Sequence, residues 1–119
     1  HEQHIEFSNI HLNSADENLM YILRYMQANF KTVSLKELSN LFNYSERQLQ
    51  RIIQSATGHT CIENIQNQKM KLASELLIHS TLSVSEISER IGFQSLNNFR
   101  KIFFKYFNMT PSEYRRANI

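Results

Sequence analysis

The sequence predicts an all-α fold, and three observations support this prediction. Its 119 residues include only two glycines and one proline, the residues that interrupt helices. It has no long run of alternating Val- and Thr-rich residues, the pattern typical of strands. Finally, Ser or Thr is followed three residues later by Glu or Gln at six places, and this capping-box pattern marks the start of a helix.

The start signals divide the chain into helices. The six capping boxes begin at Ser14, Ser34, Ser45, Thr60, Ser83 and Thr110. Ser95 supplies a seventh cap, and Pro111 follows Thr110 at the first helical position, where its missing N–H does no harm. We therefore predict seven helices, at about 15–30, 35–42, 46–56, 61–79, 84–91, 96–107 and 111–117.

One supersecondary unit occurs twice in the chain. Residues 34–53 read SLKELSNLFNYSERQLQRII. Residues 83–103 repeat this pattern as SVSEISERIGFQSLNNFRKIF, and this second copy has one extra residue between its two helices. Each copy is a short helix, a tight turn and a second helix, which is a helix-turn-helix. Gly or Asn follows each of the four helices in these two units, at the position where the chain needs a left-handed backbone to leave the helix. These four predicted stops are Asn43, Gly58, Gly92 and Asn108.

The second helix of each unit has one apolar and one polar face. At 100° per residue, the predicted core stripes are Leu49, Ile52, Ile53 and Ala56 in the first unit and Phe99, Ile102, Phe103 and Tyr106 in the second. The opposite faces carry Arg47, Gln50, Arg51 and Gln54, and Asn97, Arg100 and Lys101. Neither outward set contains Asp or Glu, although Glu46 adjoins the first. Arg and Gln can pair bidentately with guanine and adenine in the major groove, so these faces predict DNA recognition.

The charge distribution agrees with a polyanionic partner but is a weak signal. Residues 1–17 contain four of the 11 acidic side chains and none of the 13 basic ones, which leaves 13 basic and seven acidic side chains in residues 18–119.

Between the two units, residues 60–80 predict one helix of about 18 residues and roughly 27 Å. Successive major grooves on one face of DNA lie about 34 Å apart. A rigid connector of this length could hold two recognition helices near that distance.

The sequence resembles the DNA-binding domain of the AraC/XylS family of bacterial transcription regulators. The resemblance covers about residues 18–119 and is most specific in SVSEISERIGFQSLNNFRKIFFKYFNMTPSEYRR, which contains the Gly-Phe pair at Gly92 and the Pro-Ser-x-x-Tyr-Arg ending from Pro111. The sequence departs from the family pattern at several positions. Ser39 and Ser88 replace Ala, Ile53 replaces Phe, Lys69 replaces Arg, Asn108 replaces Gly, and Phe104 replaces Lys.

The resemblance implies a seven-helix fold with two helix-turn-helix lobes joined by a long connector helix. The lobes are expected at about 15–59 and 81–119, with the connector at 60–80. Residues 1–14 are expected to be a linker or arm from a missing N-terminal effector domain. The expected base contacts come from Arg47, Gln48, Gln50, Arg51, Asn97, Asn98, Arg100 and Lys101. The expected phosphate contacts come from Ser45, Ser95, Lys105 and Arg115.

Other functions are less well supported by the sequence. We find no recognised catalytic constellation, and predict no catalytic residue, metal site or cofactor. The alternative is a helical protein-interaction module that does not bind DNA. We expect double-stranded DNA as the partner, with RNA polymerase as a candidate protein partner and no membrane. A lone cysteine favours the reducing cytoplasm. The fragment is expected to be monomeric, with dimerisation through the missing domain.

Overall fold

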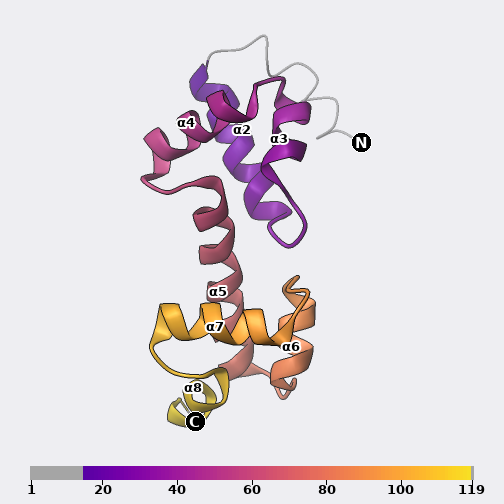
Figure 1. Ribbon diagram of the computed structural model, residues 1–119, viewed down its shortest axis with the longest axis vertical. Helices are drawn as coiled ribbons and strands as arrows, with labels where there is room; N and C mark the ends of the chain where they lie inside the picture. Colours follow the sequence, from indigo (N-terminus) through magenta and orange to yellow (C-terminus); the bar gives the residue numbers. More distant parts are fainter. Residues whose placement is uncertain (1–14, 119) are drawn as a thin grey trace. The chain divides into compact units, whose positions relative to one another are not determined.

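The described part of the protein is entirely helical. The computed structural model describes residues 15–118, which form seven α-helices and no strand (Figure 1). The helices are α2 (Ala15–Ala28), α3 (Leu35–Phe42), α4 (Glu46–Thr57), α5 (Cys61–His79), α6 (Val84–Arg90), α7 (Leu96–Phe107) and α8 (Pro111–Ala117). The predicted bounds of α3, α5, α7 and α8 are confirmed. The predicted end of α2 is two residues too late, that of α4 one residue too early, and that of α6 one residue too late.

Most of the predicted capping boxes are formed. Reciprocal hydrogen bonds join Ser45 to Gln48, Ser83 to Glu86, Thr110 to Glu113, and Thr60 to Glu63. The box at Ser34 is only half formed. Its hydroxyl accepts the backbone N–H of Glu37, but the Glu37 carboxylate accepts a hydrogen bond from Tyr25 on α2 instead of returning to Ser34. The box predicted at Ser14 lies outside the described residues.

All four predicted helix stops have a left-handed backbone. The φ angle is +61° at Asn43, +78° at Gly58, +94° at Gly92 and +60° at Asn108. These are all the positive-φ residues that residues 15–118 contain. The turn inside each helix-turn-helix and the exit from each second helix are therefore fixed by the residue types that tolerate this conformation.

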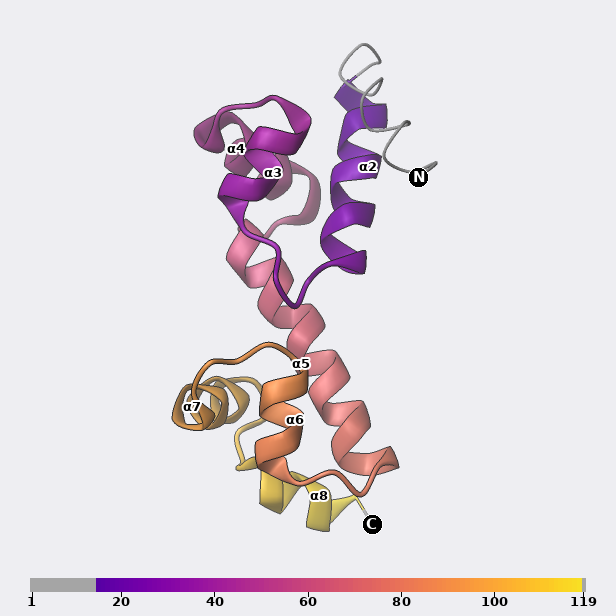
Figure 2. The ribbon, with the colours of Figure 1, turned by 90° about the vertical axis from the view of Figure 1, so that its right-hand side faces the viewer.

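The chain divides into two compact units whose boundary falls within α5. Unit 1 ends at Ile65, and unit 2 begins at Gln66. In unit 1, α2 packs with the α3–α4 pair (Figure 2). The buried core of unit 1 contains Ile22, Met26, Val33, Leu38, Phe42, Leu49, Ile53 and Cys61.

Unit 2 has a separate core that is rich in aromatic rings. Its buried residues are Met70, Ala73, Leu77, Ile87, Ile91, Phe99 and Phe103. Phe103 lies at the centre of the ring cluster, 4.5 Å from Phe107 and 5.4 Å from Tyr114 between ring centroids. Tyr114 therefore packs against the core of unit 2.

Two residues that the sequence assigned to the core are exposed. Ala56 is exposed, and Tyr106 is 37% exposed, with its hydroxyl donating to Asn67 Oδ1 at 2.7 Å. In both helices the inward stripe follows a spacing of four residues in the last turn. Phe107 therefore packs beneath Phe103, and Thr57 takes the equivalent place after Ile53, to whose carbonyl its hydroxyl donates.

We predict that Gly58→Ala lowers the free energy of unfolding by about 1–2 kcal/mol, the cost of a left-handed backbone for a residue with a Cβ. Beyond the adjacent residues of the chain, no atom lies within 4 Å of the position that the new Cβ would occupy, so steric clash with the rest of the protein does not contribute. Urea-induced unfolding would measure the change. The matched control is Ser55→Ala on the exposed face of α4, which should change the free energy by less than about 0.5 kcal/mol. Equal stability of Gly58→Ala and the parent chain would contradict the prediction.

The capping boxes predict a loss of stability in acid. A hydrogen bond from the Ser83 backbone N–H, followed in importance by one from the Ser83 hydroxyl, holds the pKa of Glu86 below its usual 4.5. Thr110 lowers the pKa of Glu113 in the same way. A carboxylate whose pKa is lowered by folding stabilises the fold above its unfolded pKa, and this contribution disappears as the pH falls through the folded pKa.

We therefore expect the double variant Glu86→Gln/Glu113→Gln to lose less stability than the parent between about pH 6 and about pH 3. The amide keeps a hydrogen-bond acceptor at each cap but does not titrate. Urea unfolding across this range tests the expectation, with Glu75→Gln on the exposed side of α5 as the control. Parallel pH profiles for the double variant and the parent would disprove it.

Candidate nucleic-acid interface

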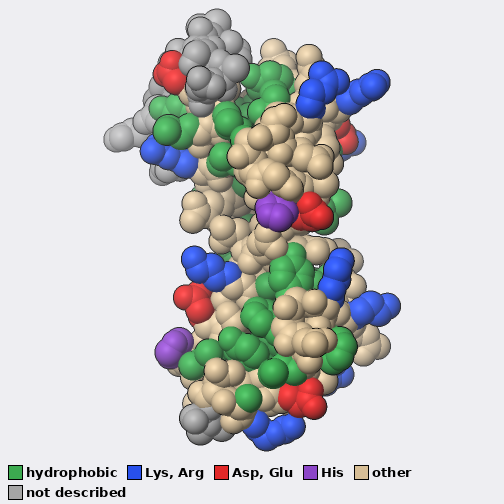
Figure 3. Space-filling model, turned by 90° about the vertical axis from the view of Figure 1, so that its left-hand side faces the viewer, with side chains coloured by type: hydrophobic (Ala, Val, Ile, Leu, Met, Phe, Trp, Pro, Cys, Tyr) green, Lys and Arg blue, Asp and Glu red, His purple; other side chains and the backbone are tan. Residues whose placement is uncertain are grey.

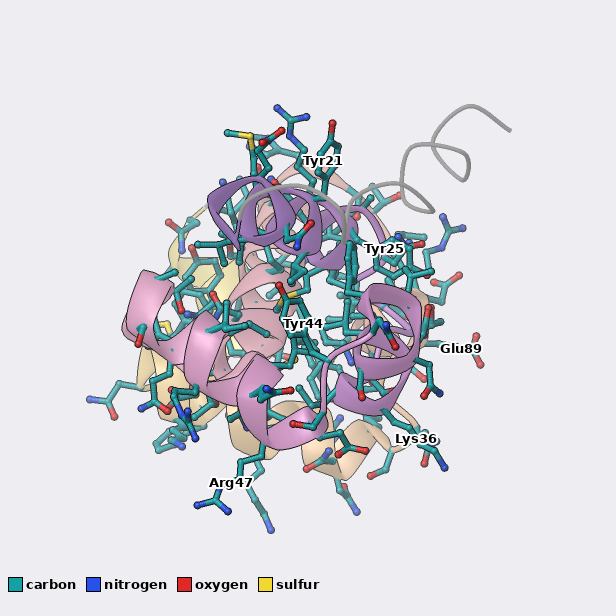
Figure 4. The ribbon with its side chains drawn as sticks, turned by 90° about the horizontal axis from the view of Figure 1, so that it is seen from above. Tyr21, Tyr25, Lys36, Tyr44, Arg47 and Glu89 are labelled. Atoms are coloured by element: carbon teal, nitrogen blue, oxygen red, sulfur yellow. The ribbon has the colours of Figure 1, made fainter. Side chains whose placement is uncertain are left out.

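In unit 1, Tyr44 fixes the turn that precedes the second helix of the pair. Its hydroxyl accepts a hydrogen bond from Asn18 Nδ2 of α2 at 3.1 Å. Its backbone carbonyl accepts one from the Ser39 hydroxyl of α3 at 2.5 Å. In Figure 4 the Tyr44 side chain points in among the helices of unit 1, whereas Arg47 points away from them. The turn is therefore held from two helices immediately before α4 begins.

The outward face of α4 is polar and accessible. Arg47, Arg51 and Gln54 are exposed, and a shallow surface groove is lined by Leu35, Glu46, Arg47, Gln50, Arg51 and Gln54. Glu46 is the acidic residue in the first turn of α4. The structure thus presents both predicted arginines of unit 1 to solvent on the same helix.

Two glutamines of α4 have hydrogen-bond partners within the chain, of which the sequence predicted only the Ser45 capping box of Gln48. Gln50 is half-buried, and its Oε1 accepts the backbone N–H of Cys61, the first residue of α5, at 2.9 Å. Gln48 Oε1 accepts the backbone N–H of Ser45 at 3.1 Å as part of the capping box. Both amide oxygens therefore accept hydrogen bonds within the chain.

In unit 2, Lys69 of α5 holds the turn between α6 and α7. Its Nζ donates to the carbonyl of Gly92 at 3.5 Å and lies 4.9 Å from the centroid of the Phe93 ring. Burial lowers the pKa of this lysine. Lys69 stands where the family pattern has Arg, and it supports the turn through one hydrogen bond and a cation–π contact.

The outward face of α7 combines amides and cations. Asn97, Asn98, Arg100, Lys101 and Lys105 are all exposed. The first turn of α7 contains no acidic residue, and its N-cap Ser95 accepts the backbone N–H of Asn98 at 3.0 Å. The helix N-terminus and the cations are thus both directed to solvent, which favours an anionic partner.

Arg115 has a structural role in unit 2. Its Nε donates to the carbonyl of Leu77 at 2.9 Å, and its Nη2 donates to the carbonyl of Ser80 at 3.2 Å. These carbonyls lie at the end of α5 and just beyond it, where a helix has no internal donors for them. Arg115 was predicted to contact phosphate, but its guanidinium is directed at α5. We therefore leave it out of the proposed DNA-binding residues.

The remaining reactive groups form no second site within the described residues. Cys61 is fully buried, and this burial raises the pKa of its thiol. His59 lies 3.7 Å from the Glu63 carboxylate in an i,i+4 pair at the start of α5. Residues 15–118 contain no group of three His, Cys, Asp or Glu side chains able to hold a metal. No described helix is long and apolar enough to span a bilayer. His1, His4 and His11 lie outside the described residues.

Comparison with known proteins agrees with this geometry. A helix-turn-helix domain family matches residues 38–117. The multiple antibiotic resistance protein MarA of Escherichia coli K12 is 31% identical over 99 residues, which cover 82% of this chain and 78% of MarA.

Two solved structures have the same fold. The C-terminal domain of AraT, a response regulator from Geobacillus stearothermophilus, has a TM-score of 0.82 and 28% identity, and the match covers 86% of each chain. The DNA-binding domain of AdpA, a global transcriptional factor solved in complex with a target DNA, has a TM-score of 0.78 and 26% identity, with 83% of this chain and 90% of AdpA's covered. The chain belongs to the AraC/XylS-type family of helix-turn-helix DNA-binding domains of transcription regulators.

Proposed function

We propose that this chain binds double-stranded DNA in a sequence-specific manner and thereby regulates transcription, with α4 and α7 as its two recognition helices. The observation that supports this most directly is the outward face of each helix. Each face presents exposed Arg and amide groups, with Lys in addition on α7. On the opposite side of each helix two apolar side chains are fully buried, Leu49 and Ile53 on α4 and Phe99 and Phe103 on α7. Side chains of these types read base edges in the major groove.

The proposed contacts fall into two groups. Exposed side chains that would contact base edges are Arg47, Gln48, Arg51, Asn97, Asn98, Arg100 and Lys101. Gln50 would join them through its amide N–H₂ group, because its oxygen already accepts a hydrogen bond from α5. Groups that would contact phosphate are the helix N-termini at Ser45 and Ser95 and the side chain of Lys105.

We further propose that both helices engage one duplex together. The 19 residues of α5 correspond to about 28 Å of helix, against about 34 Å between successive major grooves.

RNA polymerase is the protein partner that we propose, and the cytoplasm is the proposed location, because the relatives of the chain are regulators of transcription.

Selection of bound duplexes from a random pool, followed by a footprint of the preferred site, tests the function directly. A protein-interaction module predicts no enrichment of any sequence. A DNA-recognition domain predicts one enriched sequence whose affinity falls steeply with salt concentration, because bound phosphates release their counterions.

We expect Arg47→Ala and Arg100→Ala each to weaken binding to the selected site by about 1–3 kcal/mol and to relax the preference at particular base pairs. Affinity for the selected site and for single-base variants of it, measured by fluorescence anisotropy, tests this. Arg24→Ala, which removes an exposed arginine from α2, is the charge-matched control. If an arginine variant loses the same affinity on every sequence, that side chain contacts phosphate instead of a base.

Lengthening α5 should uncouple the two half-site contacts. An insertion near Lys71 would divide Met70 from Ala73 in the core of unit 2. The insertion of several residues is therefore better placed between Ile65 and Gln66, where the two units meet. We expect each half-site to be protected less strongly at a given protein concentration, since the second contact no longer benefits from the first. An unchanged footprint and affinity would refute simultaneous binding.

A further inference from the structure

One large apolar side chain lies on the outward face of α7. Phe104 follows Arg100 by four residues and Lys101 by three, a spacing that places the three side chains on one face of the helix. It is 50% exposed. It belongs neither to the buried core of unit 2 nor to the partly buried residues that pack against that core.

The other aromatic residues of α7 have clear roles within unit 2. Phe99 and Phe103 are fully buried, and Phe107 packs against both Phe103 and Tyr114. The hydroxyl of Tyr106 donates to Asn67. Phe104 has no such role, although an exposed phenyl ring forgoes the favourable burial that its neighbours gain. The ring is therefore available for a contact outside the chain.

The surroundings of Phe104 indicate which partner supplies that contact. Arg100, Lys101 and Lys105 are exposed nearby on the same helix. In the lower part of Figure 3, hydrophobic side chains reach the surface with Lys and Arg side chains around them. A cationic rim favours a polyanion, and the apolar group that a DNA major groove presents is the C5-methyl of thymine.

The position of Phe104 along α7 suits this methyl group. Phe104 lies eight residues after Leu96, the first residue of α7, or about 12 Å along the axis. Recognition helices direct their N-terminal residues at the base edges, so a residue two turns later lies nearer the margin of the groove. The thymine methyl projects from the side of the pyrimidine ring closest to its own backbone, and thus near that margin.

We propose that Phe104 is a specificity-determining residue that packs its ring against the C5-methyl of one thymine in the half-site of unit 2. This inference rests on the proposed function and adds a preference for thymine at one defined base pair. The flanking cations donate hydrogen bonds to base-edge acceptors or to phosphate and give no apolar contact to the methyl group, so this preference comes from the Phe104 ring.

Replacement of single thymines by deoxyuridine tests the proposal, because it removes the methyl group and leaves base pairing intact. In the site selected by the parent chain, we expect one replacement in the half-site of unit 2 to weaken binding about fourfold, the factor for one buried methyl group. The same replacement should have no effect on Phe104→Ala. Ile62→Ala, which removes another exposed apolar side chain (63% exposed), should keep the full methyl effect.

A second variant makes the test independent of the alanine substitution. Phe104→Lys should also lose the methyl effect, while its affinity falls more steeply with salt by about one additional phosphate contact. Both variants should unfold at the temperature of the parent chain, because Phe104 is not a core residue.

The possible outcomes separate this inference from the proposed function. If the parent chain enriches no sequence, both are wrong. If it enriches a site but prefers no thymine in the half-site of unit 2, only the role of Phe104 is overturned. The same conclusion follows if deoxyuridine weakens the parent chain and Phe104→Ala equally, or if Phe104→Ala lowers the unfolding temperature markedly.

Discussion

The orientation of both proposed recognition helices, α4 and α7, depends on the complete burial of a few apolar side chains. Leu49 and Ile53 on α4, and Phe99 and Phe103 on α7, have no exposed surface. Burying a side chain of this size contributes about 1.5–3 kcal/mol, so rotating either helix about its axis would expose several such groups at once. The opposite faces are therefore held toward solvent by the cores, independently of whether DNA is present.

Helix α5 anchors both helix-turn-helix motifs through side-chain hydrogen bonds. Gln50 of α4 bonds to the first residue of α5, Lys69 bonds to the turn before α7, and Arg115 bonds to carbonyls at the end of α5. Each bond satisfies a backbone group at a helix end or turn, where no internal partner exists. Gln50 therefore has a structural role in addition to its proposed place on the DNA-binding face of α4.

The sequence predicted the helices well because their ends are specified locally. In a capping box, the serine lies only three residues before the carboxylate or amide that accepts its backbone N–H. A helix end with a left-handed backbone depends on a single Gly or Asn. The bonds of Gln50, Lys69 and Arg115 span 11, 23 and 38 residues, and no periodicity or motif predicts such pairs. For the same reason the sequence assigned Arg115 to phosphate. The prediction that Tyr106 is a core residue was wrong. After Phe103 a helical stripe can continue at a spacing of three residues, to Tyr106, or of four, to Phe107, and the periodicity alone does not decide between them.

The two recognition surfaces differ in chemistry, although one supersecondary unit forms both. The face of α4 joins two arginines to glutamines whose amide oxygens are bonded within the chain, and it has Glu46 beside it. The face of α7 has no acidic residue in its first turn, carries two asparagines at its start, and includes an exposed phenyl ring. Dimeric helix-turn-helix proteins present identical surfaces to pseudo-palindromic sites. A single chain with two unlike surfaces has no such symmetry to match, so the sequence it recognises should differ between its two halves and define a direction along the duplex.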